Sequence, residues 1–199
     1  MMDIIEKVTT LSLERTSMTT IKSVCVFCSA SNNIPKDFLD EGYKLGQEIA
    51  KRKLHLVYGA GDCGIMGTTT DGVLAGKGTV TGVFPRVLQG LEAEHKKIQE
   101  TIIVDDMHTR KLTMFNRSDA FIILPGGFGT MDETFEVITW KQLHTHNKPI
   151  IFYNYKGYYD KWLELTNQFI DLGFASRNTR SLYDVVNNMD EIFSLLQKA

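Results

Sequence analysis

The stretch AFIILPGGFGTMDETFEVITWKQL, residues 120–143, joins a run of apolar residues to a long segment with helical spacing through a glycine-rich turn. We expect a buried strand over residues 120–125 and a helix from Met131 to about residue 144. Gly126, Gly127 and Gly129 lie between them. A buried strand that leads directly into a helix is the repeating unit of α/β proteins, so this stretch sets the expected fold class.

The same alternation of strand and helix runs along the rest of the chain. Six further apolar segments read as strands, at residues 21–29, 54–59, 79–85, 101–104, 149–154 and 182–187. Helical spacing covers residues 36–53, 65–78, 107–119, 158–174 and 189–198. Short apolar strands that are each followed by a helix indicate a doubly wound parallel sheet with helices on both faces. We expect one domain over residues 21–199, preceded by an N-terminal arm or extra helix over residues 1–20.

The composition excludes several classes of protein. With 43% apolar residues, 23% charged residues and a net charge of −2, the chain resembles an ordinary globular domain without a broad basic face. A nucleic-acid partner is therefore not expected. No apolar run approaches the roughly 20 residues that a membrane helix needs. The first twenty residues lack the cleavage pattern of a signal peptide, so we expect a cytoplasmic protein with no membrane partner.

The three cysteines do not indicate a metal or redox site. Cys25 and Cys28 form a C-x-x-C pattern, and Cys63 is the third cysteine. A redox pair needs its first thiol at a helix N-terminus, where the thiolate is stabilised. Here the pattern lies inside a predicted strand, whose two-residue period turns Cys25 and Cys28 to opposite faces. We interpret these residues as small buried hydrophobic side chains.

Two strand-to-helix turns carry unusual residues. Residues 28–33, CSASNN, contain Ser29 and other small polar side chains, which either cap the next helix or contact a ligand. Residues 59–64, GAGDCG, match the G-x-G-x-x-G fingerprint of dinucleotide sites. That fingerprint also requires an acid at the end of the next strand, which ends in GVFPR here. We therefore disfavour a nicotinamide cofactor and keep a backbone turn that can approach a nucleotide closely.

The turn PGGFGT, residues 125–130, has the features of an anion site. Its glycines expose backbone N–H groups at the positive end of a helix, and the threonine adds a hydroxyl group. The lysine that a triphosphate loop places after its last glycine is absent, so a monophosphate fits better. Asp132 and Glu133 are either ordinary acids of a first helical turn or functional carboxylates. In the second case Arg110 and Lys111 supply cationic partners.

Together these residues resemble the LONELY GUY (LOG) family of cytokinin riboside 5′-monophosphate phosphoribohydrolases, often labelled possible lysine decarboxylases. The resemblance is carried by the pattern PGG-x-GT-x-x-E, from Pro125 to Glu133, and by Arg110 and Lys111 before it. It extends from about Ile21 to the C-terminal helix. Lysine decarboxylation is not expected, because that chemistry normally uses pyridoxal phosphate on a lysine, and the ligand turns hold no lysine except Lys111.

The resemblance implies a Rossmann-like catalytic domain that forms a homodimer or a higher homo-oligomer. It also implies hydrolysis of the N-glycosidic bond of a purine nucleoside 5′-monophosphate, of the cytokinin type or AMP, to the free base and ribose 5-phosphate. No metal and no organic cofactor is implied. Glu133 and Arg110 match the catalytic positions. The expected substrate-binding residues are Gly126, Gly127, Gly129, Thr130, Lys111, Ser29, Gly59, Gly61, Met66 and Glu136.

We expect the Glu133 carboxylate to stabilise the positive charge that develops on the ribose and to orient the attacking water. Arg110 is expected to keep Glu133 ionised by lowering its pKa. Either Asp132 or solvent protonates the departing base, and Glu136 either supports the site or is a solvated acid. Ala60 and the residues CSAS stand where the family often has glycine and CGSS, which bears on base and ribose selectivity.

A second hypothesis is a non-catalytic nucleotide or cofactor carrier on the same fold. Such a protein would keep the glycines but would not need Glu133 and Arg110 together. Release of adenine from AMP separates the two hypotheses. The sequence leaves the preferred base and the biological pathway open.

Overall fold

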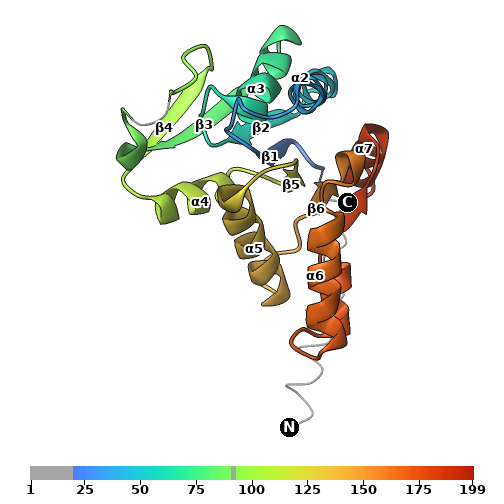
Figure 1. Ribbon diagram of the computed structural model, residues 1–199. Coiled ribbons are helices and arrows are strands. Elements are labelled where there is room, and N and C mark those ends of the chain that lie inside the picture. The colour runs from blue at the N-terminus through green and yellow to red at the C-terminus, as the bar shows by residue number, and fades with distance from the viewer. Residues whose placement is uncertain (1–19, 91–92) are drawn as a thin grey trace, which may run out of the picture.

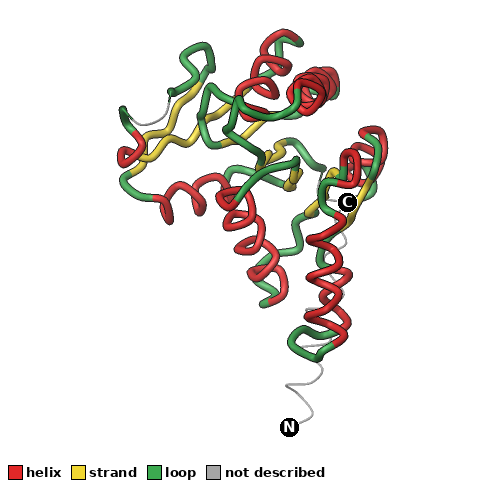
Figure 2. Tube along the Cα trace, viewed as in Figure 1, coloured by secondary structure: helices red, strands yellow, loops and turns green. Residues whose placement is uncertain are grey.

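The computed structural model describes residues 20–90 and 93–199, which form a seven-stranded parallel sheet in the order β4-β3-β2-β1-β5-β6-β7. Helices cover both faces of the sheet (Figures 1 and 2). The strands are β1 (Ser23–Phe27), β2 (His55–Tyr58), β3 (Val80–Pro85), β4 (Glu100–Val104), β5 (Ala120–Ile123), β6 (Ile150–Tyr153) and β7 (Asp184–Val186). The helices are α2 (Lys36–Lys51), α3 (Gly64–Ala75), α4 (Met107–Asn116), α5 (Phe128–Gln142), α6 (Asp160–Asp171) and α7 (Met189–Leu196), with 3-10 turns at Arg86–Leu88, Tyr155–Gly157 and Arg177–Ser181. The predicted doubly wound α/β class is confirmed.

Strand β1 lies where the order of the strands reverses. Its residue Val24 pairs with Leu56 of β2 on one side and with Ala120 of β5 on the other. From β1 the chain first builds β2, β3 and β4 outward, and then returns to place β5, β6 and β7 on the opposite side. In open α/β sheets, ligands bind outside the carboxyl ends of the strands at this kind of switch point.

Two apolar layers enclose the sheet because its central strands are buried on both faces. Val24 packs with Leu45 and Ile49 of α2 in one layer, which also includes α7 residues. Phe27 packs with Val137 of α5 in the other layer. The residues of the central strands therefore have a helix to pack against on either face, which explains why these strands read as continuous apolar runs.

The cysteines follow the predicted alternation. Cys25 is buried in the layer that contains α5, and Cys28 is buried in the layer that contains α2. Cys63 is half-buried, and all three are free. The prediction that Cys25 and Cys28 face opposite sides of the sheet is therefore confirmed, although β1 ends at Phe27, one residue before Cys28, and Cys63 is less buried than we predicted.

Helix α5 begins three residues earlier than the sequence suggested. Its first residue is Phe128, with Gly127 as the N-cap, whereas we expected a start at Met131. The glycine at position 129 lies inside the first turn, where backbone N–H groups have no partner within the helix in any case. The glycine therefore does not interrupt the helix, and the PGG turn is shorter than predicted.

The predicted N-terminal arm over residues 1–20 lies outside the described residues, except for Thr20. Within residues 20–90 and 93–199, no helix is long and apolar enough to cross a membrane.

Candidate active site

Three strand-to-helix turns meet at the carboxyl edge of the sheet, beside the switch point. The Ser29 N–H donates to the Pro125 carbonyl at 3.1 Å, and the Ser29 carbonyl accepts from the Met66 N–H at 3.2 Å. The Asn32 side-chain oxygen accepts from the Gly64 N–H at 2.7 Å. The three turns that the sequence analysis identified are therefore hydrogen-bonded to one another.

A buried ion pair lies beside these turns. Arg110 of α4 donates from Nη1 to Oε1 of Glu133, on the second turn of α5, at 2.9 Å. Only 6% of the Arg110 side chain and 10% of the Glu133 side chain are exposed. The guanidinium group also donates from Nε to the Val83 carbonyl at 3.2 Å and from Nη2 to the Gly59 carbonyl at 3.1 Å. Because Arg110 is held by three partners, its position and that of Glu133 are well defined.

Gly59 makes this arrangement possible. A Cβ at this position would overlap the Nη2 atom of Arg110. The backbone of Gly59 does not have a positive φ, so the glycine serves close approach rather than an unusual conformation. Ala60 and Gly64 have a left-handed backbone in the turn of residues 59–64, at φ 64° and 62°, a conformation that glycine adopts more readily than alanine.

Burial dominates the electrostatics of the pair. Removal of the Glu133 carboxyl group from water raises its pKa to about 7, although the neighbouring Arg110 guanidinium acts to lower it. Arg110 acts to lower the pKa of Glu133, as we expected, but desolvation outweighs this attraction, so the expectation of a lowered pKa that keeps Glu133 ionised is wrong. A carboxyl group that titrates near neutrality is well placed to exchange a proton with water.

The glycine-rich turn presents the first backbone N–H groups of α5 to solvent. Residues 127–129 are exposed, and the side chain of Phe128 is 97% exposed. Thr130 is buried and packs so closely on Gly126 that a Cβ there would collide with its hydroxyl group. Tyr158 donates from its hydroxyl group to the Gly126 carbonyl at 2.9 Å. The turn is thus fixed from within while the unpaired donors of a helix N-terminus face outward, as an anion site requires.

Lys111 is engaged by two carboxylates of α5. Its ammonium group lies 3.0 Å from Oδ2 of Asp132 and 3.3 Å from Oε1 of Glu136, and its side chain is 9% exposed. Burial alone would lower the pKa of Lys111, but the hydrogen bonds to Asp132 and Glu136 outweigh it and the pKa is raised. Lys111 and Glu136 therefore lie at the predicted site, where they hold α4 against α5.

The remaining predicted residues shape the turns. The Gly61 N–H donates to the Met66 sulfur at 3.3 Å, and this bond ties the 59–62 turn to the first turn of α3. The Ser29 hydroxyl oxygen accepts from the Ser31 N–H at 3.1 Å, which matches the turn-forming interpretation. Ser29 also lines an apolar cavity of about 230 Å³ next to the glycine turn, together with Phe38 and Tyr158.

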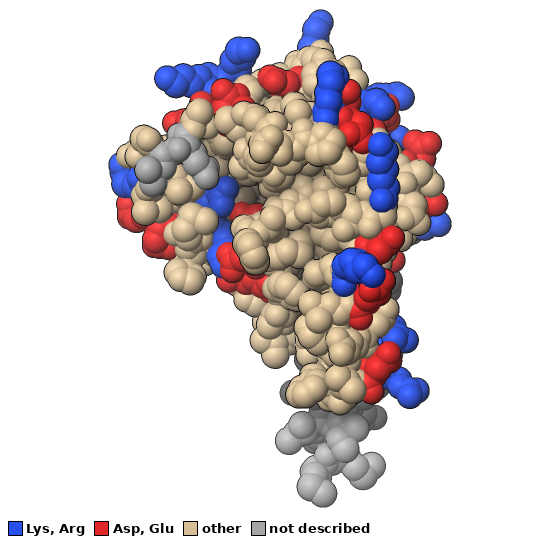
Figure 3. Space-filling view, in the orientation of Figure 1, with Lys and Arg blue, Asp and Glu red and all other residues tan. Residues whose placement is uncertain are grey.

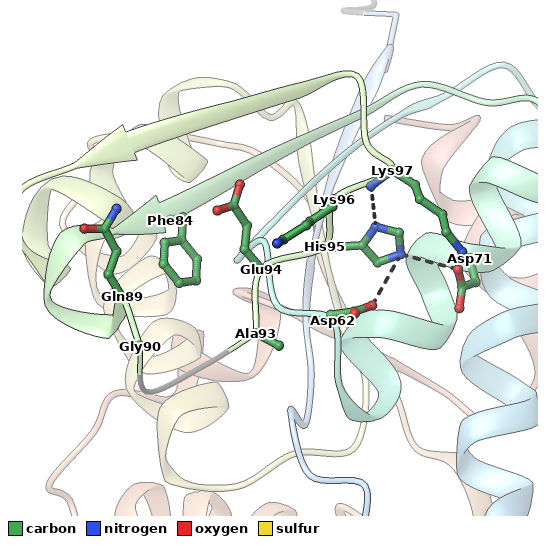
Figure 4. Close-up of a pocket in the computed structure, with 10 residues that line it drawn as sticks. All are labelled: Asp62, Asp71, Phe84, Gln89, Gly90, Ala93, Glu94, His95, Lys96 and Lys97. Carbon is green, nitrogen blue, oxygen red and sulfur yellow. Dashed lines mark hydrogen bonds and ion pairs between the residues drawn. The ribbon is translucent and has the colours of Figure 1, made fainter.

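Sequence reasoning missed two supports of this site. The hydroxyl group of Tyr159 donates to the Leu124 carbonyl at 2.6 Å, directly before the glycine turn. Residues 93–97 cross the 59–62 turn and bring the buried His95 to it (Figure 4). Both segments lie in irregular connections between secondary-structure elements, which have no periodic pattern to read. The two neighbouring tyrosines at positions 158 and 159 are the one signal that could have drawn attention to the Tyr159 contact.

The face of the molecule in Figure 3 carries both acidic and basic side chains, in keeping with the net charge of −2. Among residues 20–90 and 93–199, no three His, Cys, Asp or Glu side chains are grouped so that they could hold a metal ion. The chemistry that the described residues offer is an anion-binding helix terminus next to a buried carboxyl–guanidinium pair.

Comparison with known proteins shows which family this chain is similar to. A family model described as possible lysine decarboxylase matches residues 66–196. Cytokinin riboside 5′-monophosphate phosphoribohydrolase LOG5 of Arabidopsis thaliana is 40% identical over 176 residues, which are 88% of this chain and 77% of that protein. The probable enzyme of the same kind LOGL9, of Oryza sativa subsp. japonica, is 42% identical and is aligned over 81% of this chain and 71% of its own length.

Solved structures share the fold at lower identity. A molybdenum cofactor binding protein from Rippkaea orientalis has a TM-score of 0.68 at 19% identity, covering 88% of this chain and 95% of that one. The molybdenum cofactor carrier protein of Chlamydomonas reinhardtii has a TM-score of 0.64 at 18% identity, covering 88% of this chain and 96% of its own. At this level of identity the likeness concerns the Rossmann-like fold alone.

Proposed function

Because the chain belongs to the LONELY GUY family of cytokinin riboside 5′-monophosphate phosphoribohydrolases, we propose that it hydrolyses the N-glycosidic bond of a purine nucleoside 5′-monophosphate. The products are the free base and ribose 5-phosphate. The observation that carries the proposal is the buried Arg110–Glu133 pair, at 2.9 Å, one helical turn beyond the open N-terminus of α5. A phosphate at that terminus would bring the attached ribose to the carboxyl group.

In this mechanism the glycine turn anchors the substrate through its phosphate. The backbone N–H groups of residues 127–129 and the Thr130 hydroxyl group bind the phosphoryl oxygens at the positive end of α5. This binding is remote from the bond that breaks, so it serves to orient the ribose C1′ atom. The apolar cavity lined by Phe38 and Tyr158 lies beside the same turn and is open to a substituent of the substrate.

Glu133 then acts on the ribose. As the C1′–N bond breaks, its electron pair goes to the base and positive charge builds up on the sugar, where the ionised carboxylate stabilises it. A water molecule forms the new bond to C1′ and gives up a proton, for which a carboxylate with a pKa of about 7 is a suitable acceptor. Asp132 is ion-paired with Lys111 and its side chain is 59% exposed, so we assign protonation of the departing base to solvent.

A substrate panel tests the proposal. AMP, N6-isopentenyl-AMP, IMP and GMP are incubated with the protein, each beside its unphosphorylated nucleoside, and free base and ribose 5-phosphate are measured. We expect hydrolysis of at least one monophosphate and none of the nucleosides. Glu133→Gln should lower turnover by about 10² to 10³ while nucleotide binding is retained. Binding of a nucleotide without release of base by the unmodified protein would instead favour the carrier hypothesis.

We also propose that the chain acts as a homodimer, with AMP as one of its substrates. Apolar side chains next to the site support the dimer: Leu112 of α4 is 49% exposed, Phe135 of α5 is 40% exposed and Phe128 is 97% exposed. Large apolar groups that face water on neighbouring helices are typical of surfaces that a partner covers.

A further inference from the structure

A short segment after β3 is bound along the turn that supports Arg110. We call residues 93–97 the strap. The Asp62 N–H donates to the Ala93 carbonyl at 2.9 Å, and the His95 N–H donates to the Ala60 carbonyl at 3.0 Å. Gly61 and Glu94 form an antiparallel bridge between these two bonds. The strap is thus paired with the 59–62 turn as a short strand would be.

The side chain of His95 fastens the strap to the turn and to α3. His95 is 2% exposed, and its Nε2 atom lies 3.3 Å from Oδ1 of Asp71 and 3.7 Å from Oδ1 of Asp62 (Figure 4). The Lys97 N–H points at Nδ1 at 3.4 Å, so Nδ1 is the acceptor and Nε2 carries the hydrogen. One imidazole therefore joins the strap, the turn and the second turn of α3.

The strap is connected to the catalytic pair through adjacent peptide groups. Ala60, which accepts from the strap, follows Gly59, whose carbonyl accepts from Nη2 of Arg110 at 3.1 Å. Arg110 in turn donates to Glu133 at 2.9 Å. Ala60 has φ 64°, a conformation that an alanine keeps only when its surroundings enforce it. The hydrogen bonds between the strap and the 59–62 turn hold Ala60 in this conformation.

We propose that His95 is a positioning residue for the hydrolysis, a role that rests on the proposed function. Its imidazole holds the 59–62 turn so that the Gly59 carbonyl aims the Arg110 guanidinium at Glu133. His95 is not expected to touch the substrate. Because the phosphate is bound at a different turn, at the start of α5, loss of His95 should lower kcat and leave KM nearly unchanged.

Three variants test this role. His95→Ala removes the bond to Asp71, whereas His95→Gln keeps an N–H donor near the place of Nε2. The control is His144→Asn, because His144 is exposed and its positive φ suits asparagine. We expect kcat to fall roughly ten- to a hundredfold in H95A, to recover largely in H95Q and to stay unchanged in H144N, with KM within about twofold throughout. Unchanged kcat in H95A, or equal losses in H95A and H95Q, would overturn the proposal.

A lower kcat could also result from a smaller fraction of folded protein, and the number of binding sites per chain distinguishes this cause from a positioning effect. The stoichiometry of AMP binding is measured by calorimetry in the Glu133→Gln background, with and without His95→Ala. Equal stoichiometry alongside reduced kcat supports positioning. A stoichiometry that falls in proportion to kcat shows that His95 merely stabilises the fold, and the proposal is then wrong.

A spectroscopic measurement separates this inference from the proposed function. The buried Nε–H group of Arg110, bonded to the Val83 carbonyl, gives a ¹H–¹⁵N signal that is assigned by its disappearance in Arg110→Lys. We expect His95→Ala to shift this signal and His144→Asn to leave it in place. A signal that stays in place in H95A overturns the positioning role even if the protein hydrolyses nucleotides. A shift in a protein that hydrolyses no nucleotide would overturn the proposed function, and with it the catalytic consequence of the positioning, but it would still show that His95 holds Arg110 in place.

Discussion

Glu133 is held in a setting that raises its proton affinity although a cation lies 2.9 Å away. The pKa of this carboxyl group rises from an ordinary value of 4.5 to about 7 because burial outweighs the attraction of Arg110. Between these two values the folded protein holds a proton that the unfolded chain has released. By linkage, this residue makes the folded state less stable as pH rises from 4.5 to about 7, and contributes no further change above that.

The first prediction concerns this pH dependence. Glu133→Gln removes the titration, so the unfolding free energy of the variant relative to the unmodified protein should rise between pH 4.5 and 7 and then level off. Chemical denaturation at several pH values measures the difference, in which the other titrating groups largely cancel. Thr139→Ala, at an exposed position of α5, removes no titrating group, so this control should leave the profile flat. A flat profile for the glutamine variant would show that the carboxyl group is not desolvated.

The second prediction concerns the close approach of Gly59 to Arg110. Gly59→Ala places a methyl group where the Nη2 atom lies, so the guanidinium group must move away from Glu133. We expect kcat to fall by about 10 to 10² with little change in KM, because a displaced catalytic group is costly while the phosphate anchor is intact. Gly173→Ala is the control, because a methyl group there meets no atom within 4 Å and the residue follows α6, outside the three turns of the site, so that its positive φ affects stability rather than kcat. Equal losses in both variants would contradict the assignment.

At the scale of elements, the start of α5 shows how a binding turn can be at odds with helix stability. Gly129 lies in the first turn, and a Cβ there would meet no atom within 4 Å. An alanine would favour the helix by roughly 0.5–1 kcal/mol. The glycine at this position therefore costs helix stability, as is expected of a residue that keeps backbone donors accessible.

The third prediction follows from this conflict. Gly129→Ala should raise the unfolding free energy by about 0.5–1 kcal/mol and at the same time raise KM for the nucleotide, because the methyl group crowds the bound phosphate. Thermal and denaturant unfolding measure the first effect, and steady-state kinetics the second. Thr139→Ala, at an exposed position of the same helix far from the turn, should stabilise without changing KM. An unchanged KM in G129A would remove this turn from phosphate binding.

Elements were predictable where a single local pattern decides them. Residues 120–123 and 150–153 are apolar throughout and are buried on both faces of the sheet. Such short, continuous apolar runs identified them as central strands. The start of α5 was misplaced because glycine signals a turn in most contexts and can equally occupy a first helical turn. The glycines alone do not separate the two cases, because the turn is also fixed by a distant residue, Tyr158, whose hydroxyl group donates to the Gly126 carbonyl.

At the scale of the whole molecule, the site was predictable in its parts but not in its connections. Arg110 and Glu133 were paired from their motif, yet the carbonyl groups that fix the guanidinium come from Gly59 and Val83, far away in the chain. Such contacts follow from the order of the strands, which brings the ends of β2, β3 and β5 to one edge of the sheet. The raised pKa of Glu133 was missed for the same reason, because burial is a property of the assembled fold.

The last prediction concerns the assembly of two chains. If a second copy covers α4 and α5, a charge at Leu112 or Phe135 should separate the copies, because each side chain is 40% or more exposed in the single chain and would be buried in the pair. Sedimentation should give the unmodified protein a mass of twice the 22.5 kDa of one chain. The variants Leu112→Glu and Phe135→Glu should have a lower average mass, closer to that of one chain. Leu165→Glu, at an exposed apolar residue of α6, is the control and should stay paired. A single chain in the unmodified protein, or dissociation by the α6 variant alone, would contradict this interface.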